Sequence, residues 1–215
     1  AGNSSTILSQ PMSSVWGVYG GDNNLGNGGS VLAPNVRFSY PARIAADSKG
    51  QIFVYDNYVK TFRTIKQNGI IEHFVGTGLN SGPTEGNNVA SVSINSVSGI
   101  DFDSNDNLFF AGGSGVWMIE RNSTTGAPES FTRLYSGDSH GVVIKKDSSG
   151  DVLYFNQYTN IEAGQDPSTA HSYIFKIRID ELIQLRKTLG KIPTYDSLTK
   201  NYVVVGNGSI NLSTN

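Results

Sequence analysis

Short apolar stretches alternate with small polar turns along most of the chain, and three of these stretches align on one aspartate. They are ARIAADSKGQIFVYD at 42–56, SGIDFDSNDNLFFA at 98–111 and VVIKKDSSGDVLYFN at 142–156. In each, a short strand leads to an Asp-Ser turn and then to a second strand rich in aromatic and β-branched residues. Asp and Ser start tight turns by bonding nearby backbone groups, and Gly supplies positive φ. Each segment is therefore predicted to form a β-hairpin.

Two further strands are predicted after each hairpin, and each unit ends in an apolar run and a glycine. They lie at 59–66 and 70–76, at 116–120 and 131–136, and at 173–177 and 202–206. Four antiparallel strands in a repeat of about 45–60 residues are typical of a β-propeller blade. The chain is therefore predicted to be all-β, one propeller region over 1–215 with blades at 41–78, 97–137 and 140–208.

The third repeat carries two insertions, at 157–171 and 178–200. The second insertion contains DELIQLRKTLG at 180–190, which predicts one short helix. Asp180 is expected to cap this helix and Gly190 to end it, with Arg186 and Lys187 favourably placed near its C-terminus. Insertions on a repeat scaffold often mark the working face, although this helix could equally be padding.

The stretch YPARIAADSKGQIFVYD at 40–56 resembles the NHL repeat, which typically reads Pro-x-Gly-Ile-Ala-Val-Asp-x-x-Gly-Asn-Ile-Tyr-Val-Ala-Asp. The second repeat keeps Gly99, Ile100 and Asp103, and the third keeps Asp147 and Gly150. The resemblance implies a β-propeller. Upstream, residues 15–41 resemble the outer strand and crossover loop that precede a blade in this family.

Three blades and one isolated outer strand cannot close a ring, because propellers of this class have about four to eight blades. An open arc would leave the sides of its end blades and some strand edges uncovered. Two interpretations stay open. Either the 215 residues are part of a longer chain, or a second copy supplies the missing blades.

The composition excludes several classes of function and of site. The net charge is −2, from 16 basic and 18 acidic residues, so no basic stripe for nucleic acid is present. The apolar stretches are strand-sized, so no membrane span is expected. Cysteine is absent, which excludes disulfides, thiolate metal sites and a cysteine nucleophile. No signal peptide is visible, although the polar start AGNSSTILSQ would suit a terminus left by signal removal.

One acidic stretch needs comparison with a calcium loop. The alternation of Asp101, Asp103, Asn105 and Asn107 resembles the start of such a loop. An EF-type loop also requires Gly at its sixth position and Glu at its twelfth. These positions hold Asp106 and Gly112, so we interpret the stretch as a turn.

Histidines raise one enzymatic option, because NHL-like propellers include a zinc lyase whose metal is held by histidines at the central channel. Here His140 is expected just before the innermost strand of the third blade. His73 is expected on an outermost strand, and His171 in an insertion. These positions diverge, whereas zinc ligands must converge. No channel-facing acidic set for calcium and no nucleophile elbow is identifiable, so no catalytic, cofactor-binding or metal residue is assigned.

Two sets of surface candidates remain. Four Asn-x-Ser/Thr sequons, as many as chance predicts, lie at a terminus or in predicted loops: Asn3, Asn122, Asn207 and Asn211. Aromatic residues also gather in or just after the second strands. Most should be inter-blade core, while the rest could form a binding platform. They are Tyr55, Tyr58, Tyr154, Phe155 and Tyr158.

These observations favour an extracellular or cell-surface, non-enzymatic binding or assembly module without a cofactor. Its expected partners are protein or glycan, with self-association through open blade edges. The alternative is a propeller enzyme, a zinc- or calcium-dependent lyase or hydrolase with a channel metal, which metal analysis would reveal. A third hypothesis is an intracellular scaffold, and the detection of glycans on the protein would exclude it.

Overall fold

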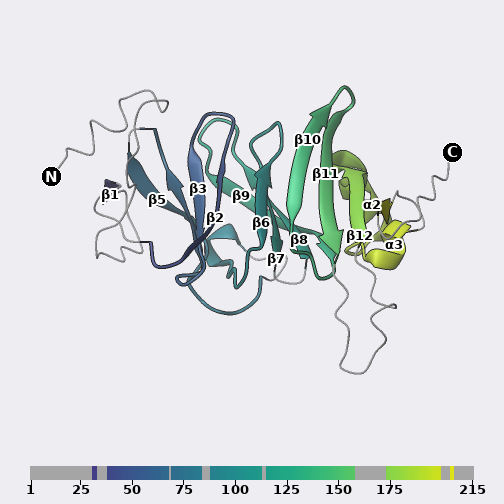
Figure 1. Ribbon diagram of the computed structural model, residues 1–215, viewed down its shortest axis with the longest axis horizontal. Coiled ribbons are helices and arrows are strands. Elements are labelled where there is room, and N and C mark those ends of the chain that lie inside the picture. Colours follow the sequence, from purple (N-terminus) through teal and green to yellow (C-terminus); the bar gives the residue numbers. More distant parts are fainter. Residues whose placement is uncertain are drawn as a thin grey trace. The chain divides into compact units, whose positions relative to one another are not determined.

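The computed structural model describes residues 31–32, 38–67, 69–83, 88–112, 115–157, 173–199 and 204–205. This part of the chain is mostly β, with three antiparallel sheets and two short α-helices (Figure 1). The chain divides into two compact units. The first comprises residues 1–84 and 88–96, and the second comprises 85–87 and 97–215.

The first unit contains a five-stranded sheet in the order β1-β5-β4-β3-β2. Its predicted hairpin is confirmed, since β2 pairs with β3 in antiparallel register. An additional short strand, β1, pairs with β5, so β5 and its His73 are not outermost as expected. The strands are β1 (Val31–Leu32), β2 (Pro41–Ala46), β3 (Ile52–Asp56), β4 (Thr61–Ile65) and β5 (Ile70–Val75).

Both faces of this sheet carry apolar side chains. On one face Phe53, Tyr55 and Phe62 are fully buried, and the Tyr55 hydroxyl donates to the Ile94 carbonyl at 2.9 Å. Ile94 belongs to a segment that begins with a 3₁₀ turn at Val89–Ser91. The opposite face holds a smaller cluster, to which Val54, Ile65, Ile71, Phe38 and Ile52 contribute.

The Asp56 side chain connects the first strands of this sheet through hydrogen bonds. Its carboxylate is fully buried and accepts from the backbone N–H groups of Ser39 at 2.7 Å and Tyr40 at 3.0 Å. It also accepts from the Tyr58 N–H at 3.1 Å. One side chain at the end of β3 thus holds both the entry to β2 and the turn before β4.

The second unit contains two four-stranded antiparallel sheets, in the orders β6-β7-β8-β9 and β10-β11-β12-β13. The predicted strands are present, and β9 starts at Pro128, earlier than expected. The first of these sheets has β6 (Gly99–Phe102), β7 (Leu108–Gly112), β8 (Gly115–Arg121) and β9 (Pro128–Ser136). The other has β10 (Val142–Asp147), β11 (Gly150–Gln157), β12 (Tyr173–Arg178) and β13 (Val204–Val205).

The main core lies between these two sheets. The Tyr135 ring on β9 lies 4.8 Å from the Phe155 ring on β11. Apolar side chains of β7 and β8 share one cluster with those of β11 and β12: Phe109, Ala111, Val116, Met118, Leu153, Phe155, Phe175 and Ile177. Burial of apolar area of this kind is the dominant favourable term in folding.

The first strands of the two sheets, β6 and β10, lie side by side. The Ile144 N–H donates to the Asp101 carboxylate at 2.6 Å. At Gly99 a Cβ atom would lie only 2.9 Å from the Val142 nitrogen, so the backbones approach too closely for a larger residue. Further from this contact, helix α2 packs against β9, β11 and β12.

The predicted helix is present as α2 (Ile179–Leu189) and ends at Gly190, which adopts the left-handed conformation with φ 62° as expected. Its predicted N-cap is wrong. Arg178 occupies that position without a capping hydrogen bond, and Asp180 lies in the first turn. A second helix, α3 (Tyr195–Thr199), was not predicted.

Candidate functional site

A polar pocket of about 370 Å³ opens at one end of the two sheets of the second unit. Its walls come from the β6–β7 turn, β8, the β10–β11 hairpin and the start of α2. We refer to it as the Asp103–Asp151 pocket. Its polar lining is Asp103, Asn105, Asn107, Glu120, Asp151, Arg178 and Asp180, and its apolar lining is Met118, Ile179 and Ile183.

Asp103 organises the β6–β7 turn. Its carboxylate accepts from the backbone N–H groups of Asn105 at 2.9 Å and Asn107 at 2.8 Å, and from the Asn107 Nδ2 at 2.8 Å. Burial raises the pKa of Asp103 and the nearby Asp151 charge raises it further, while the hydrogen bonds from Asn107 and Asn105 oppose the shift. These bonds confirm the interpretation of this stretch as a turn, since they keep the carboxylate inside it.

Asp151 links the two hairpins. Its carboxylate accepts from the Ser104 N–H at 2.9 Å and from the Ser104 hydroxyl at 2.7 Å. On β8, Glu120 accepts from the Ser130 hydroxyl. Within the described part of the chain, neither Asp103 nor Asp151 forms an ion pair, so neutral donors alone hold these two charges.

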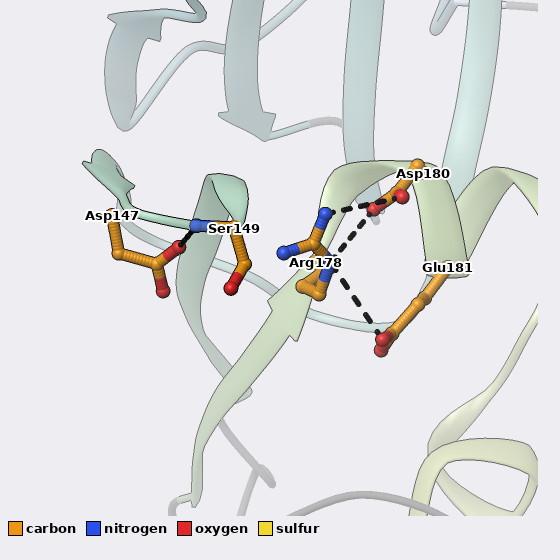
Figure 2. Close-up of polar contacts among 5 residues, drawn as sticks. All are labelled: Asp147, Ser149, Arg178, Asp180 and Glu181. Atoms are coloured by element: carbon orange, nitrogen blue, oxygen red, sulfur yellow. Dashed lines mark hydrogen bonds and ion pairs between the residues drawn. The ribbon is translucent and has the colours of Figure 1, made fainter.

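Arg178, the last residue of β12, places its guanidinium beside Asp180 and Glu181 at the start of α2 (Figure 2). Its Nε and Nη2 lie 3.2 and 3.3 Å from the two carboxylate oxygens of Asp180, and its Nε lies 3.7 Å from Glu181. The hydrogen bond with Asp180 raises the pKa of Arg178 and lowers that of Asp180. On its other side, Asp147 accepts from the Ser149 N–H at 2.7 Å.

The pocket is therefore strongly acidic. Four carboxylates line it against one guanidinium, which gives −4 + 1 = −3 at neutral pH. Its apolar residues offer a wall for an aliphatic chain. Such a site can accept a cationic group carried on an apolar stem, as in lysine or arginine side chains.

The aromatic residues proposed from the sequence differ in exposure where the structure describes them. Tyr55 lies in the core with no exposed surface, and Tyr58 is 73 % exposed. Tyr154 is half-buried on the outward side of β11, while Phe155 belongs to the core. Tyr158 lies outside the described residues. The structure thus assigns Tyr55 and Phe155 to packing, and only Tyr58 to an open surface.

Of the four sequons, only Asn122 lies within the described residues. Its Oδ1 accepts from the N–H groups of Thr124 at 3.0 Å and Thr125 at 2.9 Å. Its Nδ2, the atom that would carry a glycan, donates to Glu129 at 2.6 Å. Asn3, Asn207 and Asn211 lie outside the described residues.

The described histidines lie on exposed surfaces. The His73 Nε2 lies 2.8 Å from the Gly76 carbonyl, and the His140 Nε2 lies 3.2 Å from Asp138. His140 directly precedes β10, as expected, and His171 lies outside the described residues. Over the described ranges, no group of three or more His, Cys, Asp or Glu side chains is arranged to hold a metal ion.

The sequence pointed to Asp103 as a turn residue and to Asp180 as a cap, but not to a shared pocket. Glu120, Asp151 and Arg178 were missed altogether. The available signal was that Asp151 follows the turn glycine Gly150, while Arg178 and Asp180 open an insertion.

Neither helix of the described region has the length and apolar character to cross a bilayer.

No protein-family model and no curated protein matches the sequence. Among solved structures, a protein from Bacteroides thetaiotaomicron described as a "putative phosphatase" is 17% identical, with 85% of this chain and 39% of that chain covered at a TM-score of 0.54. A calcium structure of a Trichoderma reesei protein of Carbohydrate-Active Enzymes Family AA12 is 15% identical, with 74% and 39% covered at a TM-score of 0.45. An iodide structure from the same organism and family is 16% identical, with 80% and 44% covered at 0.43. This chain therefore spans less than half the length of each, and at this identity the first similarity shows a shared fold alone.

Proposed function

We propose that this chain is part of a β-propeller that acts as a non-enzymatic binding module, with the Asp103–Asp151 pocket as its ligand site. The propeller interpretation is supported by the one-sheet-per-repeat organisation and by the contact between β6 and β10, the first strands of adjacent sheets, where the Ile144 N–H donates to the Asp101 carboxylate. Helix α2 packs against β9 of one sheet and against β11 and β12 of the other.

The ligand is expected to present a basic side chain. The observation that carries this proposal is the imbalance of four carboxylates against one guanidinium in a pocket of about 370 Å³. Since Asp180 and Glu181 hold Arg178, the guanidinium does not neutralise Asp151, whose carboxylate accepts only from Ser104 among the described residues and can also meet a bound cation. Met118, Ile179 and Ile183 would contact the methylene groups of the same side chain. This chemistry favours a protein partner over a neutral glycan.

A titration with an oligolysine peptide tests the proposal. Asp151→Asn should weaken binding about tenfold or more, because hydrogen bonds to charged groups contribute about 1.5–3 kcal/mol. Asp138→Asn is the matched control, since it removes one exposed carboxylate outside the pocket. Binding should also weaken with added salt. Equal losses in the two variants would mean only general charge attraction, and would refute the pocket as the site.

The alternative function is an enzyme, a zinc- or calcium-dependent lyase or hydrolase with a channel metal. The description of one neighbour as a phosphatase concerns that protein. Elemental analysis of the purified chain separates the two readings, because stoichiometric zinc or calcium would overturn the binding-module proposal. An extracellular location stays a prediction, which intact-mass detection of a glycan would support.

A further inference from the structure

A second charged pocket lies at the other end of α2. It has a volume of about 330 Å³, and it lies where the helix ends at its C-cap, Gly190. The charged side chains of the described chain that line it are all cationic: Arg186, Lys187 and Lys191. They give it a charge of +3 at neutral pH, which is equal and opposite to that of the Asp103–Asp151 pocket. We call it the Lys187–Lys191 pocket.

The two pockets open on the same side of the helix. Ile179 and Asp180 line the Asp103–Asp151 pocket, whereas Arg186 and Lys187 line the Lys187–Lys191 pocket. Each residue of the second pair follows its counterpart by seven positions. Seven residues make nearly two full turns of an α-helix and advance it by about 10 Å. One side of α2 therefore carries an acidic site and a basic site about two turns apart.

The stability of α2 by itself accounts for only part of this pattern. Acidic residues near the first turn and basic residues near the last turn favour any helix through its dipole, which covers the charges of α2 itself. It does not cover Asp103, Glu120 and Asp151, which the sheets bring to the N-terminal end of the helix. At the other end, Lys187 and Lys191 are exposed and form no ion pair with any described residue. Both ends thus present charge to a partner.

We propose that the basic ligand of the Asp103–Asp151 pocket is supplied by Lys187 and Lys191 of a second copy of this chain, an inference that rests on the function proposed above. Two α2 helices that approach antiparallel, about a two-fold axis between Ile183 and Gln184, place the acidic end of each helix against the basic end of the other. Both contacts then form together, as in any isologous interface. This surface is separate from the open blade edges that the sequence suggested for self-association.

Charge complementarity favours a second copy over an unrelated partner. Each copy supplies three cations for a pocket that holds four carboxylates and one guanidinium, at the same spacing along the helix. The chain as a whole carries a net charge of only −2, so two copies repel one another weakly at long range. Since the contact centres on one helix of 11 residues, it belongs to the class of small interfaces, below about 1,200 Å², that are typical of transient complexes.

Analytical ultracentrifugation over a series of protein concentrations tests the proposal at low salt, where charges are least screened. The chain should form a dimer and no larger species, because a two-fold contact closes on itself. The double variant Lys187→Gln/Lys191→Gln should raise the dissociation constant of the dimer about hundredfold, about tenfold for each of its two contacts. The matched control is Lys145→Gln/Lys176→Gln, which removes the same charge from exposed side chains of the third sheet and should leave the constant unchanged.

Oligolysine separates this inference from the proposed function. The peptide should dissociate the dimer, because it competes for the Asp103–Asp151 pocket, and Asp151→Asn should weaken both the dimer and the binding of oligolysine. A chain that stays monomeric, while oligolysine still binds in a manner that depends on Asp151, would exclude a second copy as the ligand and leave the proposed function intact. A dimer that both lysine double variants weaken equally, or that Lys187→Gln/Lys191→Gln leaves unchanged, would also overturn the inference. A monomeric chain that does not bind oligolysine would refute the inference and the proposed function together.

Discussion

The backbone N–H of Ile144 donates to the Asp101 carboxylate at 2.6 Å, so a side chain of β6 supplies the partner that the edge strand β10 would otherwise lack. The bond connects residues 43 positions apart. It also gives Asp101 a structural role, as the acceptor of a bond between the two sheets.

Replacing Asp101 should therefore weaken the contact between the two sheets. Asp101→Ala is expected to lower the free energy of unfolding by about 1–3 kcal/mol, because it removes a charge-assisted hydrogen bond and leaves an N–H without its acceptor. Asp101→Asn keeps an acceptor oxygen and should recover most of that loss. Urea unfolding of the two variants checks this, and equal stability of Asp101→Ala and the parent chain would contradict it.

Asp103 should give stability an unusual pH dependence. Burial raises its pKa in the folded chain, so the folded state holds the proton more tightly than the unfolded state, whose pKa is about 3.9. The contribution of Asp103 is then most favourable below that value and is lost as the pH rises through the folded pKa. Compared with Asp103→Asn, the parent chain should lose stability between pH 4 and neutrality. A constant difference in unfolding free energy across this range would contradict the raised pKa.

Two buried tyrosines form a matched pair. The Tyr55 hydroxyl donates to the Ile94 carbonyl, whereas the Tyr135 hydroxyl has no hydrogen-bond partner among the described residues. Tyr55→Phe should cost about 0.5–1.5 kcal/mol or slightly more, because a bond is lost and a carbonyl is left unsatisfied. Tyr135→Phe should be neutral or stabilising. Thermal unfolding of both variants tests this difference. A larger loss of stability for Tyr135→Phe than for Tyr55→Phe would refute it.

Gly99 should resist substitution. A Cβ atom there would lie 2.9 Å from the Val142 nitrogen and 3.0 Å from the Gly141 Cα, both backbone atoms. Gly99→Ala is therefore expected to cost about 1–3 kcal/mol through forced separation of β6 and β10. Gly82→Ala is the control, because its nearest neighbour is a side-chain atom at 3.6 Å. Similar urea midpoints for the two variants would show that the strands can separate without cost.

The strand pattern was predictable because each repeat marks its turn with Asp-Ser and its strands with aromatic and β-branched residues. Which side chains of β11 point into the core was not predictable. In the third hairpin four residues separate the paired Lys146 and Asp151, whereas in the first hairpin five residues separate the paired Ala46 and Ile52. This turn is one residue shorter, and a shift of one residue exchanges the two faces of a strand. Alignment on the aspartate therefore matches Tyr154 to the buried Val54, although Leu153 and Phe155 are the core residues.

Other features lacked a local signal. The five residues of α3 are too few to establish a helical period, and that helix is held by tertiary contacts such as the Tyr195 ring 4.8 Å from Tyr173. The Asp103–Asp151 pocket depends on turns 47 residues apart, joined by Ser104 and Asp151. Only the folded arrangement of two sheets brings these side chains to one place.

The two-residue strand β1 has a consequence for solubility. Its pairing of Val31 with Ile71 and of Leu32 with Ile70 occupies backbone groups on the outer side of β5. An uncovered edge strand offers a row of N–H and C=O groups on which another molecule can continue the sheet, the first step of amyloid-like growth. A chain shortened past Leu32 would keep the hydrophobic cluster of the first sheet but acquire such an edge, so we expect it to form fibres more readily than the parent chain.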